Sequence, residues 1–318
     1  MEKKQEILKI LAARIREIVS RMSVDFNELN EIRLRVNEPF IVLIGGKEYF
    51  VSDIGKLVGQ AEEGYVVKPR DIKETLEYIS SYSLYAYEDE IRQGFITVQG
   101  GHRVGLAGKV ILEQGKVKSV RNISFINIRM SHEKKGCGEE LIPYIYEDRD
   151  ICHTLIISPP GGGKTTLLRD IVRLISDGDD KHIGLNVGVV DERSEIGAAY
   201  MGVPQNDVGI RTDVLDCCPK ALGMLMMIRS MSPAVIAVDE IGKREDVDAL
   251  AYVMNCGCKM IATVHGNSIE DIRNKPVLRK LIEEKLFTRF IVLAGDGKPG
   301  RVDKVFDERG TVLYQGEA

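Results

Sequence analysis

Residues 158–166 read SPPGGGKTT, and the interpretation of the whole chain starts from this stretch. It nearly fits G-x-x-x-x-G-K-[ST], the pattern of a glycine-rich loop that cradles phosphates. Ser158 stands where the pattern has its first glycine. The apolar run 153–158 predicts a buried strand before the loop, and apolar residues at helical spacing in 165–176 predict a helix after it. Strand, loop and helix in this order favour a phosphate-binding loop.

The residue types in this loop suit the binding of ATP and Mg²⁺. Its glycines let the backbone approach closely and adopt positive φ, and the helix dipole that follows favours phosphate. Lys164 supplies a cation for the β and γ phosphates, and Thr165 supplies a hydroxyl for Mg²⁺. We expect the nucleotide to be bound by Ser158, Pro159, Pro160, Gly161, Gly162, Gly163, Lys164, Thr165 and Thr166.

A second apolar run, AVIAVDE at 234–240, ends in two acids. Asp239 is the expected Mg²⁺ ligand, and Glu240 is the expected base that polarises the attacking water. The separation of about 75 residues from the phosphate loop strengthens this reading over that of a solvated strand end.

Another acidic box, VVDERSEI at 189–196, keeps an alternative open, because it offers Asp191, Glu192 and Glu195 as catalytic carboxylates. We favour Glu240 and retain Glu192 as a candidate. A helix N-terminus that favours negative charge is the structural alternative for the box.

His265 ends a further apolar run, KMIATVH at 259–265. A histidine at a strand end can donate to a γ-phosphate or pass its state to a neighbour, so His265 is a candidate sensor. The competing reading is a purely structural histidine.

The composition and patterning suggest two domains. Residues 1–135 show an amphipathic N-terminal helix, alternating strands and a hairpin or meander at 94–129, which predict a smaller α+β domain. Residues 136–318 show short apolar runs that end in polar residues, which predict an α/β domain with a mainly parallel sheet. The polar segment 131–140 is the expected linker.

The remaining composition limits the functional class. The net charge of −4 argues against a broadly basic surface, and no uninterrupted apolar window reaches the length of a membrane span. Six cysteines lack C-x-x-C spacing, so we expect reduced thiols in the cytoplasm rather than a metal site.

The order of phosphate loop, DERSEI box, VIAVDE and ATVHG resembles the secretion-type RecA-like ATPases, and is closer still to one sporulation member of that superfamily. The resemblance runs from about residue 28 to 310. It implies a RecA-like P-loop ATPase domain and a homo-oligomer, expected to be a hexamer. It also implies a location peripheral to a membrane, on the mother-cell face of the forespore envelope, where the protein would energise membrane-embedded channel subunits.

The same resemblance implies arginines that reach the phosphates from a neighbouring subunit or from the N-terminal domain. Arg103 and Arg129 match arginine-bearing strands of the family's N-terminal domain, and Arg193 and Arg211 lie near the acidic box. An ordinary surface arginine is the alternative for each of the four.

Three other functions agree less well with the sequence. A nucleic-acid-dependent ATPase would need a basic stripe and stacking aromatics, yet the chain has no Trp and no clustered basic run, so no specific nucleic acid is expected. A GTPase usually carries N-K-x-D, and 274–277 reads NKPV. A non-hydrolysing ATP-binding scaffold disagrees with the full set of Lys164, Thr165, Asp239 and Glu240.

Overall fold

The computed structural model describes the chain outside residues 1, 84–86, 149, 296–298 and 317–318. It divides into two compact units, unit 1 (Met1–His132) and unit 2 (Glu133–Ala318). The division falls inside the polar segment 131–140. Among the described residues, no helix combines the length and the apolar composition needed to cross a membrane.

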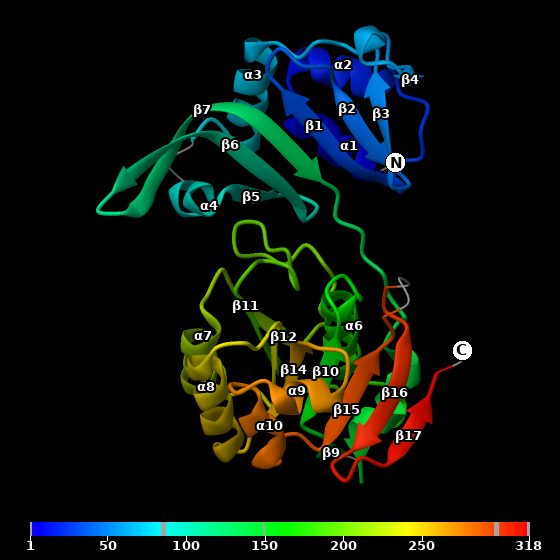
Figure 1. Ribbon diagram of the computed structural model, residues 1–318, viewed down its shortest axis with the longest axis vertical. Coiled ribbons are helices and arrows are strands. Elements are labelled where there is room, and N and C mark those ends of the chain that lie inside the picture. Colours follow the sequence, from blue (N-terminus) through cyan, green and yellow to red (C-terminus); the bar gives the residue numbers. More distant parts are fainter. Residues whose placement is uncertain (1, 84–86, 149, 296–298, 317–318) are drawn as a thin grey trace. The chain divides into compact units, whose positions relative to one another are not determined.

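Unit 1 is built on an antiparallel sheet, which within the described residues has seven strands in the order β4-β3-β2-β1-β7-β6-β5 (Figure 1). The predicted meander at 94–129 is formed by the last three strands. The strands are β1 (Leu29–Arg35), β2 (Ile41–Ile44), β3 (Lys47–Val51), β4 (Leu57–Val58), β5 (Phe95–Val98), β6 (His102–Glu113) and β7 (Lys116–Arg129).

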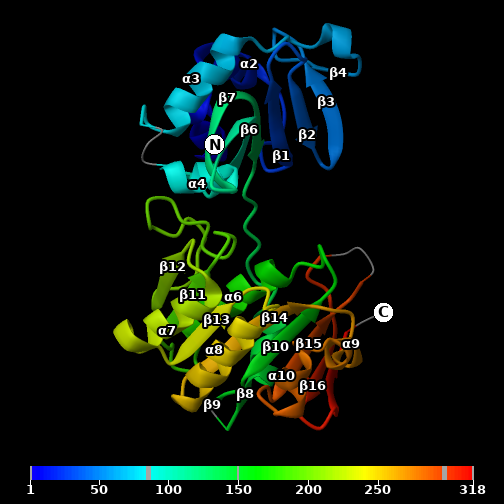
Figure 2. The same cartoon turned by 60° about the vertical axis from the view of Figure 1, so that its left-hand side comes forward.

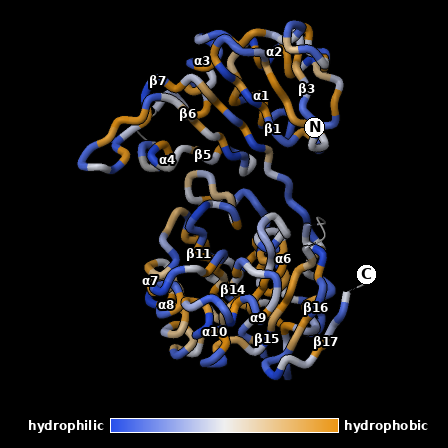
Figure 3. The backbone as a smooth tube through the Cα atoms, in the orientation of Figure 1, coloured by the Kyte–Doolittle hydropathy of each residue, from blue (hydrophilic) through white to orange (hydrophobic). Residues whose placement is uncertain are grey.

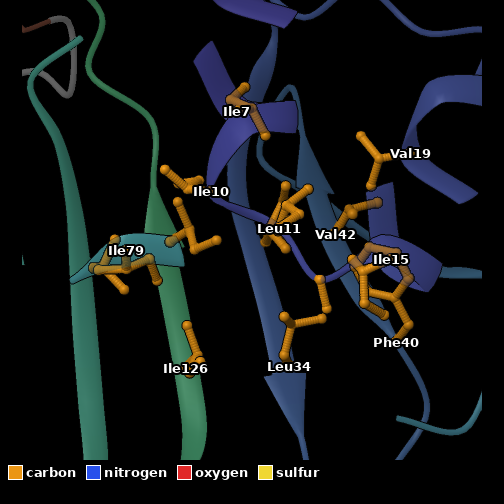
Figure 4. Packing of buried hydrophobic residues seen from close by; sticks show 14 of the residues in the cluster. Ile7, Ile10, Leu11, Ile15, Val19, Leu34, Phe40, Val42, Ile79 and Ile126 are labelled. Atoms are coloured by element: carbon orange, nitrogen blue, oxygen red, sulfur yellow. The ribbon is translucent and has the colours of Figure 1, made fainter. Parts of the chain in front are cut away.

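One face of this sheet is covered by helices. In β1 the residues Ile32 and Leu34 are buried and alternate with partly exposed arginines, as the sequence pattern predicts. Figure 4 shows Leu34 of β1 in the same cluster as Ile7 and Ile15 from the N-terminal helices. The helices of unit 1 are α1 (Glu2–Ile10), α2 (Ala13–Arg21), α3 (Pro69–Ile79) and α4 (Glu88–Gln93).

The N-terminal amphipathic stretch forms two helices rather than one. The helices α1 and α2 are separated at Leu11 and Ala12, and the amide of Ala12 donates to Thr75 Oγ1 at 3.0 Å. This contact ties the break to α3. Ile7, Leu11 and Ile15 are fully buried, so the stretch packs on its own unit.

Unit 2 contains the mainly parallel sheet that the sequence predicts. Within the described residues the strand order is β12-β11-β13-β14-β10-β15-β16-β17, with only the last two strands antiparallel. Figure 2 shows the central strands side by side. The strands are β10 (Thr154–Ser158), β11 (Val187–Asp191), β12 (Thr212–Asp216), β13 (Val235–Val238), β14 (Lys259–His265), β15 (Arg289–Leu293), β16 (Val302–Asp307) and β17 (Val312–Gln315).

Two apolar cores flank this sheet. In β10, Leu155 and Ile157 belong to one core and Ile156 belongs to the other, because successive side chains of a strand point to opposite faces. The tube in Figure 3 is accordingly hydrophobic along the central strands. The helices are α5 (Ile142–Ile145), α6 (Lys164–Asp177), α7 (Lys220–Ser230), α8 (Arg244–Asn255), α9 (Ile269–Asn274) and α10 (Arg279–Glu283), and a small ribbon pairs β8 (Tyr146–Glu147) with β9 (Asp150–Ile151).

The parallel arrangement brings the ends of several strands to one edge. Ser158 at the end of β10 pairs in register with His265 at the end of β14, and β13 lies beside β14. Chemistry in open parallel sheets gathers at the carboxyl edge of the strands. The phosphate loop, the acids at the ends of β11 and β13, and His265 lie at this edge.

Candidate functional site

The phosphate loop joins β10 to α6. Gly161 and Gly163 have φ of 73° and 88°, a backbone region that L side chains rarely adopt. The amide of Gly162 donates to the carbonyl of Pro159 at 3.1 Å, which closes the turn. Helix α6 begins at Lys164, so its N-terminal amides and its dipole face the loop.

Ser158, which replaces the pattern's first glycine, is fully buried at the base of the loop. Its hydroxyl donates to the carbonyl of Pro159 at 2.9 Å, and its own carbonyl accepts the amide of Gly266 at 3.0 Å. A Cβ on Gly162 would lie 2.4 Å from the Ser158 hydroxyl. A side chain at position 162 would therefore displace the Ser158 hydroxyl, and glycine avoids this.

Lys164 is partly exposed and makes no hydrogen bond or ion pair with any residue that the structure describes. Thr165 beside it has its hydroxyl on Asp239, and Thr166 occupies the third position of the helix. A cation at the head of a glycine-rich loop, with no partner among the described residues, is suited to bind phosphate oxygens.

The strand-end acid Asp239 joins two threonines. One carboxylate oxygen accepts the hydroxyl of Thr165 and the other accepts the hydroxyl of Thr263. The Thr263 oxygen in turn accepts the amide of Glu240 at 2.8 Å. Thr263 belongs to none of the motifs recognised in the sequence. Its signal was a lone hydroxyl two positions before His265 in an otherwise apolar strand.

Glu240 is positioned by three groups. Its backbone has φ of 60° and is held by Thr263. Its carboxylate lies 2.6 Å from Arg193 Nη1 and 3.3 Å from His265 Nε2. The other ring nitrogen of His265 is buried and finds no partner in the described part of the chain. A glutamate with fixed backbone and a histidine contact can hold a water and take up its proton.

The carboxylate of Glu192 has different partners from that of Glu240. Its carboxylate accepts a hydrogen bond from the buried Lys220 and lies 3.8 Å from Lys243. Burial disfavours the charged form of Glu192, but the hydrogen bond and charge of Lys220 outweigh it and lower the pKa, with smaller contributions from other basic groups. Glu192 and Glu240 line one pocket of about 420 Å³, so they are near each other but have different partners.

The other acids of the box differ in role. Asp191 is buried, and its carboxylate accepts the amides of Glu195, Ile196 and Gly197 at 2.8–2.9 Å. Burial outweighs these donors and raises the pKa of Asp191 to about 6. Arg169 of α6 donates to the carbonyls of Glu195 and Ile196 at 2.6 Å. Asp191 and Arg169 thus fix the shape of the segment after β11.

The four candidate arginines have different surroundings. Arg193 reaches Glu240, as described above. Arg211 donates to the carbonyls of Ser176 and Asp177 at the C-terminal end of α6, about 20 Å along the helix from its phosphate-facing end. It caps that helix end.

Arg103 and Arg129 both lie in unit 1, where they are cross-strand partners in β6 and β7. The Arg103 guanidinium lies 4.3 Å from the centre of the Phe95 ring, and Arg129 Nε lies 3.3 Å from Glu31. Within unit 1 they therefore make a cation–π contact and an ion pair.

The loop after β15 also contacts the phosphate loop, which the sequence analysis missed. The amide of Gly300 donates to the carbonyl of Gly162 at 2.8 Å. A Cβ on Gly163 would lie 2.4 Å from the Gly300 nitrogen. This close approach needs glycine at position 163, and no local pattern in the sequence signals it.

The donor set fits ATP with Mg²⁺. The Thr165 hydroxyl and the Asp239 carboxylate present oxygen ligands side by side, and Mg²⁺ prefers oxygen. The glycine backbone, the N-terminus of α6 and the ammonium of Lys164 suit a polyphosphate.

Fold and loop together define a class, the P-loop proteins with the fold of the secretion ATPases. The chain belongs to the family described as Sporulation stage III, protein AA, whose model matches residues 1–313. It is 43% identical over 309 residues to stage III sporulation protein AA of Bacillus subtilis, covering 97% of this chain and 96% of that protein. It is also 34% identical over 130 residues, 40% of this chain, to SEEDLING PLASTID DEVELOPMENT 1 of Arabidopsis thaliana, of which that match covers 18%.

Solved structures share the fold. The pilus retraction motor PilT with bound ADP aligns with a TM-score of 0.56 at 15% identity, over 90% of this chain and 77% of PilT. The ATPase DotB of Legionella pneumophila aligns with a TM-score of 0.54 at 14% identity, over 89% of this chain and 78% of DotB. The predicted fold class and the resemblance to the secretion ATPases are therefore confirmed.

Proposed function

We propose that the protein is an ATP-hydrolysing motor that works as a homo-hexamer and energises a membrane channel complex between mother cell and forespore. Membership of the sporulation family supports the setting, and the fold of PilT and DotB supports the motor. The observation that carries the proposal is the contact of Thr165 with Asp239, with Glu240 next in sequence at the edge of the phosphate loop.

In this proposal the loop 158–166 binds the triphosphate. Its amides and the ammonium of Lys164 orient the terminal phosphates and neutralise their charge. Thr165 and Asp239 would hold Mg²⁺, which supplies further charge neutralisation on the phosphate oxygens when bound. Thr263 keeps Asp239 and the backbone of Glu240 in fixed positions.

Glu240 acts as the base toward the attacking water. Its carboxylate carries two contacts, Arg193 and His265, and each is a group that a phosphate oxygen can attract. His265 is the candidate sensor, because it joins the base to the end of β14. Among the described residues, Arg193 contacts the proposed base directly.

The proposed partners are further copies of the chain and membrane-embedded channel subunits. The proposed location is the cytoplasm of the mother cell, peripheral to the forespore membrane. No specific nucleic acid is proposed as a partner.

ATP turnover measured against protein concentration tests the proposal, with mass photometry on the same samples. Wild type is compared with Glu240→Gln and with the matched variant Glu192→Gln. We expect turnover to rise as hexamers form. We expect Glu240→Gln to bind ATP but to lower kcat by about 10²-fold or more, as loss of a general base does.

The matched variant separates the two carboxylates. Glu192→Gln breaks the contact with Lys220 and should lower stability while keeping turnover. If Glu192→Gln abolishes turnover and Glu240→Gln keeps it, the base lies in the acidic box. Stimulation of turnover by single-stranded DNA would replace the channel motor with the nucleic-acid-dependent alternative, and binding without turnover in assembled wild type would favour a scaffold.

A further inference from the structure

The hairpin of β6 and β7 continues beyond the sheet of unit 1 as a two-stranded ribbon, residues 108–122. In the described residues β5 pairs with β6 only as far as Gly105, and β1 pairs with β7 only from Phe125 onward. Figure 1 shows the ribbon extending past the end of the sheet. Among the residues that the structure describes, the two ribbon strands therefore pair only with each other.

The ribbon has a defined start and a defined tip. The register shifts between Ala107 and Lys109, and a Cβ on Gly108 would lie 2.6 Å from the carbonyl oxygen of Arg121. Such a bulge bends a strand pair away from its sheet. At the tip, Gln114 and Gly115 have φ of 51° and 75°, as a tight two-residue hairpin turn requires.

The pairing register gives the ribbon two unlike faces. The apolar ribbon face consists of the cross-strand pairs Val110–Val120 and Leu112–Val117. The basic ribbon face consists of the pairs Lys109–Arg121, Ile111–Ser119 and Glu113–Lys116. Lys118 lies at the register shift between them. The ribbon thus carries four basic side chains and one acidic side chain, in a chain whose net charge is −4.

Most of the apolar ribbon face is exposed to solvent, while Val120 is partly buried against the core of unit 1. Val110, Leu112 and Val117 are 50%, 63% and 39% exposed. The ribbon also contacts the rest of unit 1, because Arg92 of α4 donates to the carbonyl of Lys118 at 2.9 Å and Val120 packs against the core. Exposed apolar side chains grouped on one face of a projecting ribbon indicate a surface that binds another molecule or a membrane.

The charge of the ribbon indicates what its apolar face binds. A protein with a net negative charge presents here a local positive excess next to an apolar face. Lysine and arginine stems can lie along an apolar surface while their charged ends reach phosphate. This combination fits an anionic lipid bilayer, in which apolar side chains enter the boundary of headgroups and acyl chains.

We propose that the ribbon 108–122 docks the protein on an anionic membrane surface, with the apolar ribbon face inserted and the basic side chains on the lipid phosphates. The inference rests on the proposed function for its membrane setting, but docking needs no ATP hydrolysis. The two ideas therefore fail independently.

The chain has no tryptophan, so a single introduced one reports on the ribbon. Leu112→Trp places it on the apolar ribbon face, and Ser119→Trp places it on the opposite face as the matched control. Full-length protein is mixed with vesicles of phosphatidylglycerol and phosphatidylcholine, or of phosphatidylcholine alone. We expect a blue shift of emission for Leu112→Trp on anionic vesicles, and a much smaller shift for Ser119→Trp.

Charge is tested in the same assay. Lys109→Gln and Lys116→Gln should each weaken binding to anionic vesicles by about fivefold, because each basic residue near such a surface contributes about that factor. Circular dichroism shows whether each variant is folded. Leu112→Trp combined with Lys164→Ala should bind vesicles as well as Leu112→Trp alone, which separates docking from nucleotide chemistry.

Three results would overturn the proposal. The first is an unshifted emission on anionic vesicles with folded Leu112→Trp. The second is equal binding to neutral vesicles, which would remove the role of charge. The third is a blue shift without vesicles that grows with protein concentration, which would assign the apolar ribbon face to a second copy of the chain.

Discussion

Arg193 Nη1 lies 2.6 Å from Glu240 Oε2, so the acidic box after β11 supplies a cationic partner to the acid at the end of β13. The sequence presents these residues as members of two separate motifs. In the structure they belong to one site, together with His265 at 3.3 Å from the same carboxylate.

This pair predicts a variant that affects catalysis more than stability. The Arg193 side chain is largely exposed, so its ion pair should contribute less than about 1 kcal/mol to folding. If Arg193 also stabilises charge on the phosphates, Arg193→Ala should lower kcat by about 10²–10³-fold. Turnover and thermal unfolding are measured together. Arg211→Ala is the control, since Arg211 caps the far end of α6. An unchanged kcat in Arg193→Ala would show that the pair of Arg193 and Glu240 is only a surface contact.

The contacts of Thr263 suggest a second variant that affects both catalysis and stability. Thr263→Val removes the hydroxyl that joins Asp239 to the amide of Glu240, and leaves both groups short of a partner. A lost buried hydrogen bond of this kind costs about 1–3 kcal/mol. We expect lower stability and, in addition, a lower kcat and a weaker dependence on Mg²⁺.

The matched control for that variant is Thr154→Val in β10. Thr154 is equally buried and donates to the carbonyl of Cys152 at 2.9 Å, away from the site. Both variants should unfold more easily in denaturant, but only Thr263→Val should impair turnover by the remaining folded protein. Equal effects on turnover would mean that Thr263 acts only on the fold.

We expect alanine substitutions at two glycines of the phosphate loop to lower the free energy of unfolding by different amounts. Gly161→Ala meets no atom within 4 Å and carries only the strain of positive φ, about 1–2 kcal/mol. Gly163→Ala carries similar strain and also collides with Gly300, which adds about 1–3 kcal/mol. Chemical unfolding of both variants checks the order. Equal losses of unfolding free energy would show that Gly300 moves away from the added methyl group at little cost.

Asp191 predicts a dependence of stability on pH. Its pKa rises from an ordinary 3.8 to about 6 because burial disfavours its charge. A raised carboxyl pKa gives a contribution to stability that is full below the unfolded pKa and is lost as pH rises through the folded pKa. Relative to Asp191→Asn, which does not titrate, wild type should lose up to roughly 3 kcal/mol between about pH 4 and pH 8.

Unfolding of both proteins across that range tests this, and carbon NMR of the Asp191 carboxyl gives its midpoint directly. Asparagine loses one acceptor toward the amides after β11, but that loss does not vary with pH. A stability difference that stays flat from pH 4 to pH 8, or a midpoint near the ordinary value, would contradict the prediction.

Local patterns predicted much of the fold. The strands β10, β11, β13 and β14 were visible as short apolar runs, since a strand buried on both faces leaves little choice of residue. The antiparallel β16 and β17 were not, because they are partly exposed and their pairing is a long-range choice. The break between α1 and α2 was missed for a similar reason, since its contact with Thr75 lies 63 residues away.

The sequence by itself determined the phosphate loop and the acid pair Asp239–Glu240, because glycine conformation, strand burial and adjacency are local properties. Only the tertiary structure decided which partner each acid takes. In the structure Arg193 pairs with Glu240, Lys220 pairs with Glu192, and Gly300 contacts the phosphate loop. These contacts join residues far apart in the chain, and their geometry follows from strand order and register, which local sequence patterns do not encode.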